Sequence, residues 1–245
     1  MKQWTLLDKE VWNHFIKKAG EVLELRGLGF RKYAAAWDYE YATGTVAGYF
    51  NDYDCFVHFT KMLMKVDEQV KSKGIYFTLQ VINPDLIARA LNRILPAKET
   101  TSDHDVLAYR WLPIDLDPIR PAGISSSDEE LEHACVLSEK ILDFNEGRGW
   151  PKPIQAMSGN GYHLLYPLAD FPAQDPEVKK YVKAQLSELS DKFSNEHVKV
   201  DKALFNPARI IKLYGTTARK GDPVEPSPHH VGRPHRQSYI FNLGE

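Results

Sequence analysis

Two aspartates lie two positions apart inside an apolar run, W-L-P-I-D-L-D-P-I-R-P at residues 111–121. In a strand, residues two apart project from the same face, so Asp115 and Asp117 would lie side by side while Leu116 packs on the opposite face. Neighbouring buried carboxylates repel each other, and a divalent cation that prefers oxygen ligands, Mg²⁺ or Mn²⁺, relieves that repulsion. The spacing therefore indicates a metal site, although solvated acids on an exposed edge strand would give the same pattern.

A glycine-rich stretch follows at residues 157–163, M-S-G-N-G-Y-H. Two glycines permit a tight turn whose backbone N–H groups face an anion, as in phosphate-binding nests. The hydroxyl of Ser158 and the imidazole of His163 would add side-chain donors to a phosphate oxygen. An ordinary β-hairpin turn is the alternative, and the motif taken by itself slightly favours the turn. The candidate phosphate-binding residues are Ser158, Gly159, Asn160, Gly161 and His163.

A third concentration of charge begins just after Asp201. The stretch 202–236 has two acids and seven basic side chains, which are Lys202, Arg209, Lys212, Arg219, Lys220, Arg233 and Arg236. The whole chain has a net charge of −2, so this local excess predicts a phosphate-facing surface. A solvated, proline-rich loop is the alternative. That alternative does not account for Arg209 and Lys212, which stand in the apolar sequence R-I-I-K-L-Y and need a partner if buried.

Together, these three features supply the groups that two-metal phosphoryl transfer requires. Carboxylates would hold cations that activate a 3′-hydroxyl and stabilise the leaving pyrophosphate. His163, Arg209 and Lys212 would neutralise a triphosphate. Such a site works by positioning and charge, so the protein needs no covalent chemistry of its own.

The elements that must position these residues alternate without a regular β-α-β rhythm, which predicts an α+β fold. Helices are predicted over 6–19 and 53–71, from the Ser127–Glu130 capping box to Gly147, and from Asp175-Pro176 onward. Asn83-Pro84 predicts a further short helix. Strands are predicted over Gly74–Ile82, around residues 111–118, over Ile154–Met157 and over 163–168, with a strand-like aromatic pattern between 21 and 50.

Composition sets wider limits. The 245 residues, 43% of them hydrophobic and 26% charged, suffice for one large domain or two small ones. Two cysteines, Cys55 and Cys135, cannot form a four-thiolate zinc site and are predicted to be buried thiols. The first residues lack the apolar segment of a signal peptide, and no stretch is long enough to cross a membrane. We therefore expect a soluble, cytoplasmic protein.

The motifs resemble those of the archaeo-eukaryotic primase superfamily, in particular its primase-polymerase (PrimPol) branch from mobile elements and CRISPR-linked defence systems. That superfamily has an acid pair, a small residue followed by histidine, and a single acid after a hydrophobic residue. The matching residues here are Asp115 and Asp117 in PIDLDP, Ser158 and His163 in SGNGYH, and Asp201 in KVDK. The similarity extends to GIYFTL, NPDLIARALNRI, NPARIIKLYGT and RPHR, and so spans about two-thirds of the chain.

The resemblance implies one catalytic domain over 1–245. An RRM-like antiparallel or mixed sheet in 106–245 would join an N-terminal α/β portion in 1–105, with helices packed on the sheets. It also implies template-directed nucleotidyl transfer, as a DNA polymerase and DNA primase, with the three aspartates as ligands of Mg²⁺ or Mn²⁺. Many primases carry a zinc-binding module, but this sequence departs from them, since two lone cysteines exclude such a module and no zinc is expected. Ser158, His163, Arg209 and Lys212 would hold the incoming nucleotide, with Tyr76 near its sugar. Further candidates for template or primer contacts are Arg219, Lys220, Arg233, His235 and Arg236.

The implied partners are a DNA template and primer, dNTPs or NTPs, and a helicase or accessory primase domain in a longer protein. Two other classes stay open at this point. A metal-dependent nuclease would use the same acids, and a single-strand-binding module with a decayed site would use Tyr162, Tyr166 and Tyr214 as stacking platforms. A glycosyltransferase is disfavoured because no sugar-nucleotide motif accompanies the acids.

Overall fold

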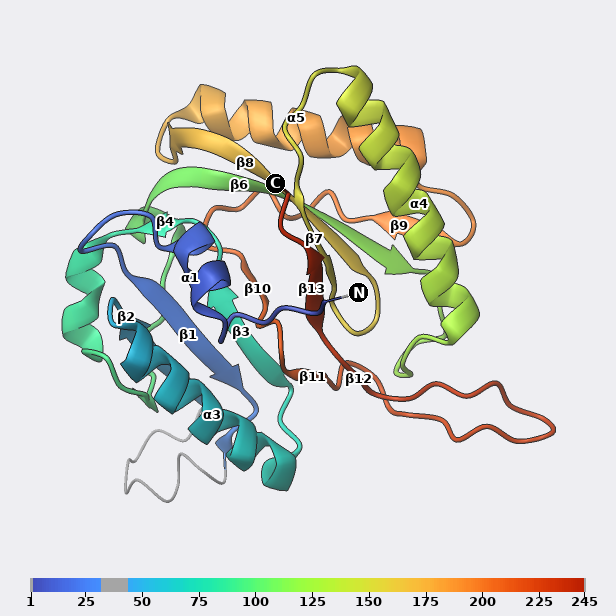
Figure 1. Cartoon of the computed structure of the whole chain (residues 1–245), viewed down its shortest axis with the longest axis horizontal. Helices are drawn as coiled ribbons and strands as arrows, with labels where there is room; N and C mark the ends of the chain where they lie inside the picture. The colour runs from blue at the N-terminus through green and yellow to red at the C-terminus, as the bar shows by residue number, and fades with distance from the viewer. Residues whose placement is uncertain (1, 32–43, 245) are drawn as a thin grey trace.

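The structure, a computed structural model, describes residues 2–31 and 44–244. These residues form two antiparallel sheets that lie side by side, each covered by helices, with a short two-stranded ribbon (Figure 1). The α+β prediction is confirmed. The strand-like aromatic pattern predicted between 21 and 50 falls partly on residues 32–43, which lie outside the described residues.

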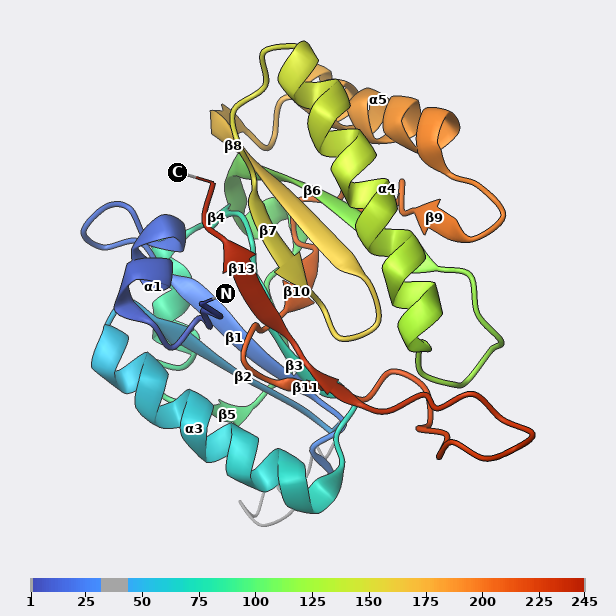
Figure 2. The same cartoon turned by 45° about the vertical axis from the view of Figure 1, so that its right-hand side comes forward.

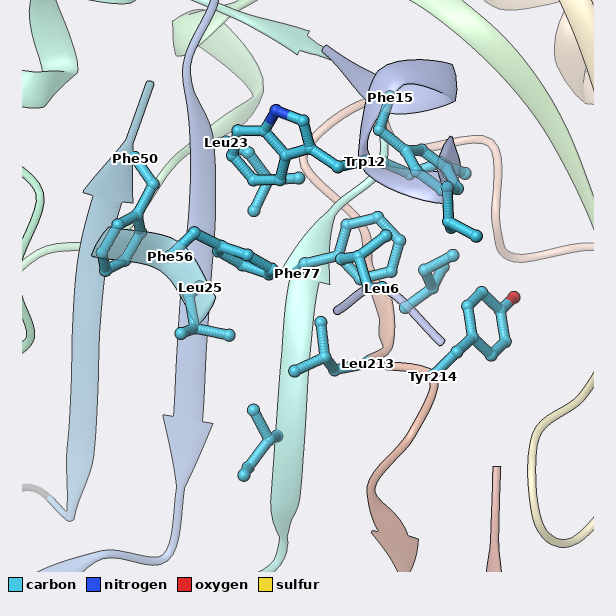
Figure 3. Packing of buried hydrophobic residues seen from close by; sticks show 14 of the residues in the cluster. Leu6, Trp12, Phe15, Leu23, Leu25, Phe50, Phe56, Phe77, Leu213 and Tyr214 are labelled. Carbon is cyan, nitrogen blue, oxygen red and sulfur yellow. The ribbon is translucent and has the colours of Figure 1, made fainter. Parts of the chain in front are cut away.

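The first sheet has the strand order β10-β3-β1-β2-β5, and every neighbouring pair is antiparallel. Its strands are β1 (Leu23–Leu28), β2 (Thr45–Phe50), β3 (Gly74–Thr78), β5 (Leu95–Pro96) and β10 (Ile210–Lys212). Helices α1 (Lys9–Phe15) and α3 (Tyr53–Val70) pack on one face. Aromatic side chains fill that interface: the rings of Trp12 and Phe56 lie 4.7 Å apart, and those of Phe15 and Phe77 lie 5.0 Å apart (Figure 3).

The helix predicted over 53–71 is confirmed, but the one predicted over 6–19 is shorter, at Lys9–Phe15. Ile16 is already extended, and the carboxylate of Glu21 accepts hydrogen bonds from the backbone N–H groups of Lys17 and Lys18. A side chain thus replaces the carbonyl partners that another helical turn would have supplied.

The second sheet has the order β13-β7-β8-β6-β4, and β9 also pairs with β6. Its strands are β4 (Val81–Ile82), β6 (Val106–Pro118), β7 (Ile154–Met157), β8 (Tyr162–Pro172), β9 (Val198–Val200) and β13 (Tyr239–Asn242). Helices α4 (Asp128–Gly147) and α5 (Pro176–Phe193) cover one face, as Figure 2 shows. The succession β6-α4-β7-β8-α5-β9, with neighbours β7-β8-β6-β9, is a split β-α-β unit.

The helix ends follow the sequence signals. The capping box of Ser127 and Glu130 is present at the start of α4. Asp175 accepts from the backbone N–H of Glu177 at the start of α5. Asn83 caps a 3₁₀ helix over Pro84–Arg89, and a second 3₁₀ helix spans Asp103–Asp105. Local capping chemistry therefore sets the start of the two helices that cover the second sheet.

The strand predicted over Gly74–Ile82 is divided between the two sheets, because β3 belongs to the first and β4 to the second. The side chain of Gln80 occupies the crossing point. Its Oε1 accepts from the backbone N–H groups of Arg110 and Trp111, and its Nε2 donates to the carbonyl of Trp111. The prediction of one continuous strand was wrong, since an apolar run carries no mark of a change of sheet.

The sheets do not divide the chain at residue 105. β4 precedes that residue yet pairs with β6, and β10 lies far beyond it yet pairs with β3. The ribbon of β11 (Thr217–Ala218) and β12 (Arg236–Gln237) carries the loop 219–235, which reaches away from the body of the molecule in Figures 1 and 2. Both cysteines are half-buried rather than buried. Among the described residues, no helix has the length and apolarity to span a bilayer.

Candidate active site

The carboxylates of Asp115 and Asp117 lie on β6, inside the second sheet. β8 pairs along one side of this strand, and β4 and β9 pair along the other. Ile114 and Leu116 are fully buried beneath α4 and α5, so Asp115 and Asp117 project from the opposite face. The strand is therefore not an exposed edge, and burial on one face fixes the direction of both aspartates.

Three polar residues form a row across three neighbouring strands. Asp115 is the register partner of His163 on β8, and the imidazole Nε2 lies 3.5 Å from Asp115 Oδ1. On the other side, the backbone N–H of Asp201 donates to the carbonyl of Asp115 over 2.9 Å, directly after β9. Directly opposite residues on antiparallel strands share a face. The three motifs, distant in sequence, thus meet at one place on the sheet.

This face borders a pocket of about 300 Å³ whose other wall comes from the first sheet. Tyr76 on β3 and Lys212 on β10, which are register partners, stand on that wall. The pocket brings together eleven of the residues singled out from the sequence: Tyr76, Asp115, Asp117, Ser158, Asn160, His163, Asp201, Arg209, Lys212, Arg219 and Lys220. Its volume is at the lower end of the range for small-molecule sites.

The two aspartates of β6 respond to burial in opposite ways. Burial alone would raise the pKa of Asp115, but the nearby His163, Lys220 and Arg120 outweigh it and hold that pKa below its usual value. Burial, together with the charge of Asp115, raises the pKa of Asp117. The pair therefore carries a repulsion that an added cation would relieve.

The donor chemistry of the pair fits Mg²⁺ or Mn²⁺. Asp115 and Asp117 supply hard carboxylate oxygens on one face of a strand. Burial and the charge of Asp115 raise the pKa of Asp117, and a bound cation would favour its ionised form. Within the described ranges, no three His, Cys, Asp or Glu side chains are clustered tightly enough to enclose a metal ion. The ligands already side by side are thus two, and Asp201 lines the same pocket with its Oδ1 accepting from the N–H of Ala203.

His163 is held from behind by Tyr214. The imidazole Nδ1 and the Tyr214 hydroxyl lie 2.8 Å apart, and both side chains are buried. Burial and the charge of Asp115 raise the pKa of Tyr214 well above its usual value. The ionised carboxylate of Asp115 can only accept a hydrogen bond from Nε2, which leaves Nδ1 to accept from the Tyr214 hydroxyl. We assign the remaining imidazole proton to Nε2, which faces Asp115 and the pocket. Tyr214, considered from the sequence as a stacking platform, is instead a buried residue that orients His163.

Lys212 and Arg219 form a cationic wall opposite the aspartates. Lys212 is buried, its Nζ donates to the carbonyl of Thr217 over 2.8 Å, and it lies 5.7 Å from the ring centre of Tyr76. Burial lowers the pKa of Lys212 to about 7. Arg219 pairs with Asp67 of α3, whose other oxygen accepts from Ser72. Asp67 is buried and gives Arg219 a fixed partner behind the pocket.

The glycine-rich segment is a hairpin turn between β7 and β8, as one of the two interpretations predicted. The N–H of Ser158 donates to the Gly161 carbonyl, and the N–H of Gly159 points at the sulfur of Met157. The amide of Asn160 binds backbone groups of Ser126 and Lys220. Two backbone donors and the asparagine amide are thus engaged within the fold, which leaves Ser158 and Asn160 as lining residues and His163 as the group aimed into the pocket.

Three of the candidate template contacts lie away from the pocket. Arg233 forms a two-pronged ion pair with Glu130, and Arg236 pairs with Asp128, both at the start of α4. His235 Nε2 lies 2.9 Å from the carbonyl of Gly221. Arg233 and Arg236 thus fasten the C-terminal end of the 219–235 loop to the start of α4, so two of the seven basic side chains counted from the sequence serve the fold.

Four charged residues in and around this site were not predicted from the sequence. Lys73 lines the pocket. Asp67 stands behind it, and Arg120 and Lys199 flank Asp117. Only Lys199 had a usable signal: in V-K-V-D it precedes Asp201 by two residues and must share its face. Of the other proposed stacking aromatics, Tyr166 is buried and Tyr162 is half-buried against Phe241.

No family profile and no curated protein matches this sequence. The solved structures that are similar to it include a primase-polymerase domain and a primase. One is the AEP domain of the primase-polymerase (PrimPol) of cyanophage S-2L, at 14% identity and a TM-score of 0.48, over 97% of this chain and 92% of that one. The other is the primase RepB′, at 13% identity and a TM-score of 0.45, over 95% of this chain. The match spans 55% of the RepB′ chain.

Proposed function

We propose that this chain is a template-directed nucleotidyltransferase, a DNA polymerase that also acts as a DNA primase. One observation carries the proposal: a same-face carboxylate pair and a cationic wall, contributed by two different sheets, face each other across a single pocket. Five cations line that pocket, at Lys73, Arg209, Lys212, Arg219 and Lys220, against three carboxylates. The excess of positive charge suits a polyanionic substrate better than a neutral one.

The cationic wall would bind the triphosphate of the incoming nucleotide. Lys212 and Arg219 are held in fixed positions by Thr217 and Asp67, so little conformational freedom is lost when the phosphates bind. Arg209 is exposed at the mouth of the pocket and adds a planar, bidentate donor. His163, with its proton on Nε2, donates from the opposite wall.

Asp115, Asp117 and Asp201 would hold Mg²⁺ or Mn²⁺. When bound, these cations favour the ionised 3′-hydroxyl and neutralise the charge that develops on the leaving pyrophosphate. In the reaction, the 3′-oxygen forms a bond to the α-phosphorus, the bond from that phosphorus to pyrophosphate breaks, and the hydroxyl proton passes to water. The carboxylates position the reacting groups and make no covalent bond themselves.

Sugar selection is assigned to Tyr76. Its ring is half-buried beside Lys212, and its hydroxyl donates to the carbonyl of Lys73 over 3.2 Å. A rigid aromatic next to the phosphate-binding lysine would contact the sugar of a bound nucleotide. An unchanged ratio of dNTP to NTP incorporation in Tyr76→Ala would remove this residue from the proposal.

The test is synthesis on single-stranded DNA, with and without a labelled primer, with dNTPs and NTPs supplied separately and with Mg²⁺, Mn²⁺ or a chelator. We expect longer products that require metal. Asp115→Asn and Asp117→Asn should each reduce the rate at least about a hundredfold, as loss of a charge-stabilising group does. Asp191→Asn, an exposed acid on α5, is the matched control and should retain the rate.

Titration of Mn²⁺ by electron paramagnetic resonance gives a readout that does not depend on activity. Both β6 variants should lose Mn²⁺ affinity, and Asp191→Asn should keep it. Shortened primers would identify a nuclease instead. Oligonucleotide binding without any change of length would identify a binding module, and undiminished synthesis by Asp115→Asn would refute two-metal catalysis.

A further inference from the structure

A second hollow, of about 410 Å³, lies on the other side of Asp117 from the pocket just described. The segment 117–124 forms one wall, and Lys199, Lys220 and Gly221 form the other. Asp117 and Lys220 line both hollows, so the two are neighbours that share one carboxylate and one cation. None of the functions assigned so far uses the second hollow.

Lys199 stands in a fixed relation to the candidate metal ligands. Lys199 is the register partner of Asp117 on the β6–β9 ladder. Two residues further along the chain, Asp201 lies opposite Asp115. The side chains of Lys199 and Asp117 therefore leave the sheet on the same face. Lys199 is exposed, and no carboxylate lies within ion-pair distance of it among the described residues. The ladder thus presents an available cation beside the carboxylates.

The opposite wall has a different chemistry. Arg120 folds back on its own turn, donating from Nε to the carbonyl of Ile124 and from Nη1 to that of Pro118, and lies 3.8 Å from Asp117. The guanidinium of Arg120 is therefore held against its own turn, and it contributes positive charge to the hollow without projecting from it. Ile119 is 54% exposed on the same turn and, with Pro121, offers an apolar surface. One wall suits a phosphate and the other suits the apolar face of a sugar or base.

We propose that this hollow holds the nucleotide whose 3′-hydroxyl attacks, with its phosphate on Lys199 and its sugar or base against Ile119. This inference rests on the proposed function, because it gives the second substrate a place on the far side of Asp117 from the incoming triphosphate. Lys220, 3.6 Å from Asp117 and shared by both hollows, lies between the two nucleotides. The recognised chemistry is a phosphorylated nucleoside with a free 3′-hydroxyl.

Such a nucleotide has two sources: the end of an existing strand, or a free nucleoside triphosphate that starts one. The experiment compares Lys199→Ala with Lys199→Arg, which keeps the charge, and with Lys65→Ala, which removes an exposed cation from α3 in the other half of the fold. One arm measures the KM for primer and for incoming dNTP during extension. A second measures dinucleotide formation on unprimed template. A third measures binding of a fluorescent oligonucleotide by anisotropy over a range of salt concentrations.

For Lys199→Ala we expect the KM for primer, the KM for the initiating nucleotide, or both, to rise roughly fivefold to tenfold. The KM for the incoming dNTP should not change, and the slope of log affinity against log salt should fall by about 0.7, the value for one lost single-strand phosphate contact. Lys199→Arg and Lys65→Ala should behave as wild type. The arm that responds identifies the source of the nucleotide.

Unchanged values in both synthesis arms, or a rise confined to the KM for incoming dNTP, would overturn the inference. If the wild-type protein performs no synthesis, the proposed function fails by itself. The anisotropy measurement then tests the hollow by itself. A smaller salt slope in Lys199→Ala, with no change in Lys199→Arg or Lys65→Ala, supports a phosphate site there, and an unchanged slope rejects it.

Discussion

Among single residues, Lys212 has a charge that depends on whether a nucleotide occupies the pocket. The pocket desolvates its ammonium group and lowers its pKa to about 7, although the nearby carboxylate of Asp67 acts in the opposite direction. Near neutral pH, the empty pocket therefore contains a mixture of charged and neutral lysine. A bound triphosphate favours the charged form, so binding must draw a proton from solvent.

We expect nucleotide affinity to weaken as the pH rises through about 7, because Lys212 then loses its charge in the empty pocket. Isothermal titration of a non-hydrolysable nucleotide at pH 7.5, in two buffers of different ionisation enthalpy, should show uptake of a fraction of a proton. Lys212→Arg, which stays charged, should abolish that uptake and flatten the pH dependence. Equal heats in the two buffers for wild type would contradict the prediction.

Sequence alone could place the carboxylates but not the residues that support them. Alternation in a strand puts Asp115 and Asp117 on one face whatever the rest of the chain does. The partners of Arg219 and His163 are a different matter. Asp67 is 152 positions from Arg219, and Tyr214 is 51 from His163, so neither contact leaves a local pattern. Arg233 and Arg236 show a related difficulty. Both were counted as available positive charges, but a count of charges does not reveal their ion-pair partners on α4.

At the scale of elements, the turn between β7 and β8 depends on close approach to β6. A Cβ atom placed on Gly161 would lie 2.2 Å from the carbonyl oxygen of Leu116. That carbonyl lies on the strand between the two aspartates. Gly161 is therefore needed for the close approach of the turn before β8 to β6 at the site, as well as for the conformation of the turn itself.

Gly161→Ala should lower the free energy of unfolding by about 2 kcal/mol or more, because the backbone of β6 must shift to admit the methyl group. Urea denaturation measures this loss, and synthesis should fall with it as Asp115 and Asp117 are displaced. Gly147→Ala is the control: it lies at the end of α4 with nothing within 4 Å of an added Cβ, and should be neutral or slightly stabilising. Equal stability of the two variants would show that β8 adapts without cost.

Helices were more predictable than strand partners. Caps such as Ser127 and Asp175 act within one turn, so α4 and α5 begin where the sequence says. Strand pairing is decided by distant residues. The run from Gly74 to Ile82 has one composition but serves two sheets, and only the side chain of Gln80, bound to the backbone of β6, marks the change.

At the scale of the whole molecule, Arg110 ties the two halves together. This β6 side chain is 2% exposed, forms two-pronged ion pairs with Glu21 and Asp170, and donates to the carbonyl of Phe15 at the end of α1. Burial raises and Arg110 lowers the pKa of Glu21, with a net decrease, and Arg110 is the main cause of the lowered pKa of Asp170. A buried group with three partners is costly to remove because its partners lose their counter-charge.

Arg110→Met should therefore destabilise the fold by about 3 kcal/mol at pH 7. Glu21 and Asp170 have lowered pKa values in the folded protein, so their contribution is complete above the unfolded pKa and disappears as the pH falls through the folded values. The difference between wild type and variant should consequently narrow below about pH 4. Urea midpoints at pH 7 and pH 3.5 measure it. Lys180→Met, which removes an exposed pair with Glu177, should leave both midpoints in place.

Each sheet contains strands that lie far apart in the sequence, and this has a consequence for folding during synthesis on the ribosome. β3 gains its outer neighbour only when β10, at Ile210–Lys212, has been made, and β7 gains its own only with β13, at Tyr239–Asn242. Until then the nascent chain presents two unfinished sheet edges, each able to pair with a foreign strand. The pocket between the sheets therefore forms only after β10 has been made, and the growing chain is vulnerable to aggregation until β10 and β13 have emerged.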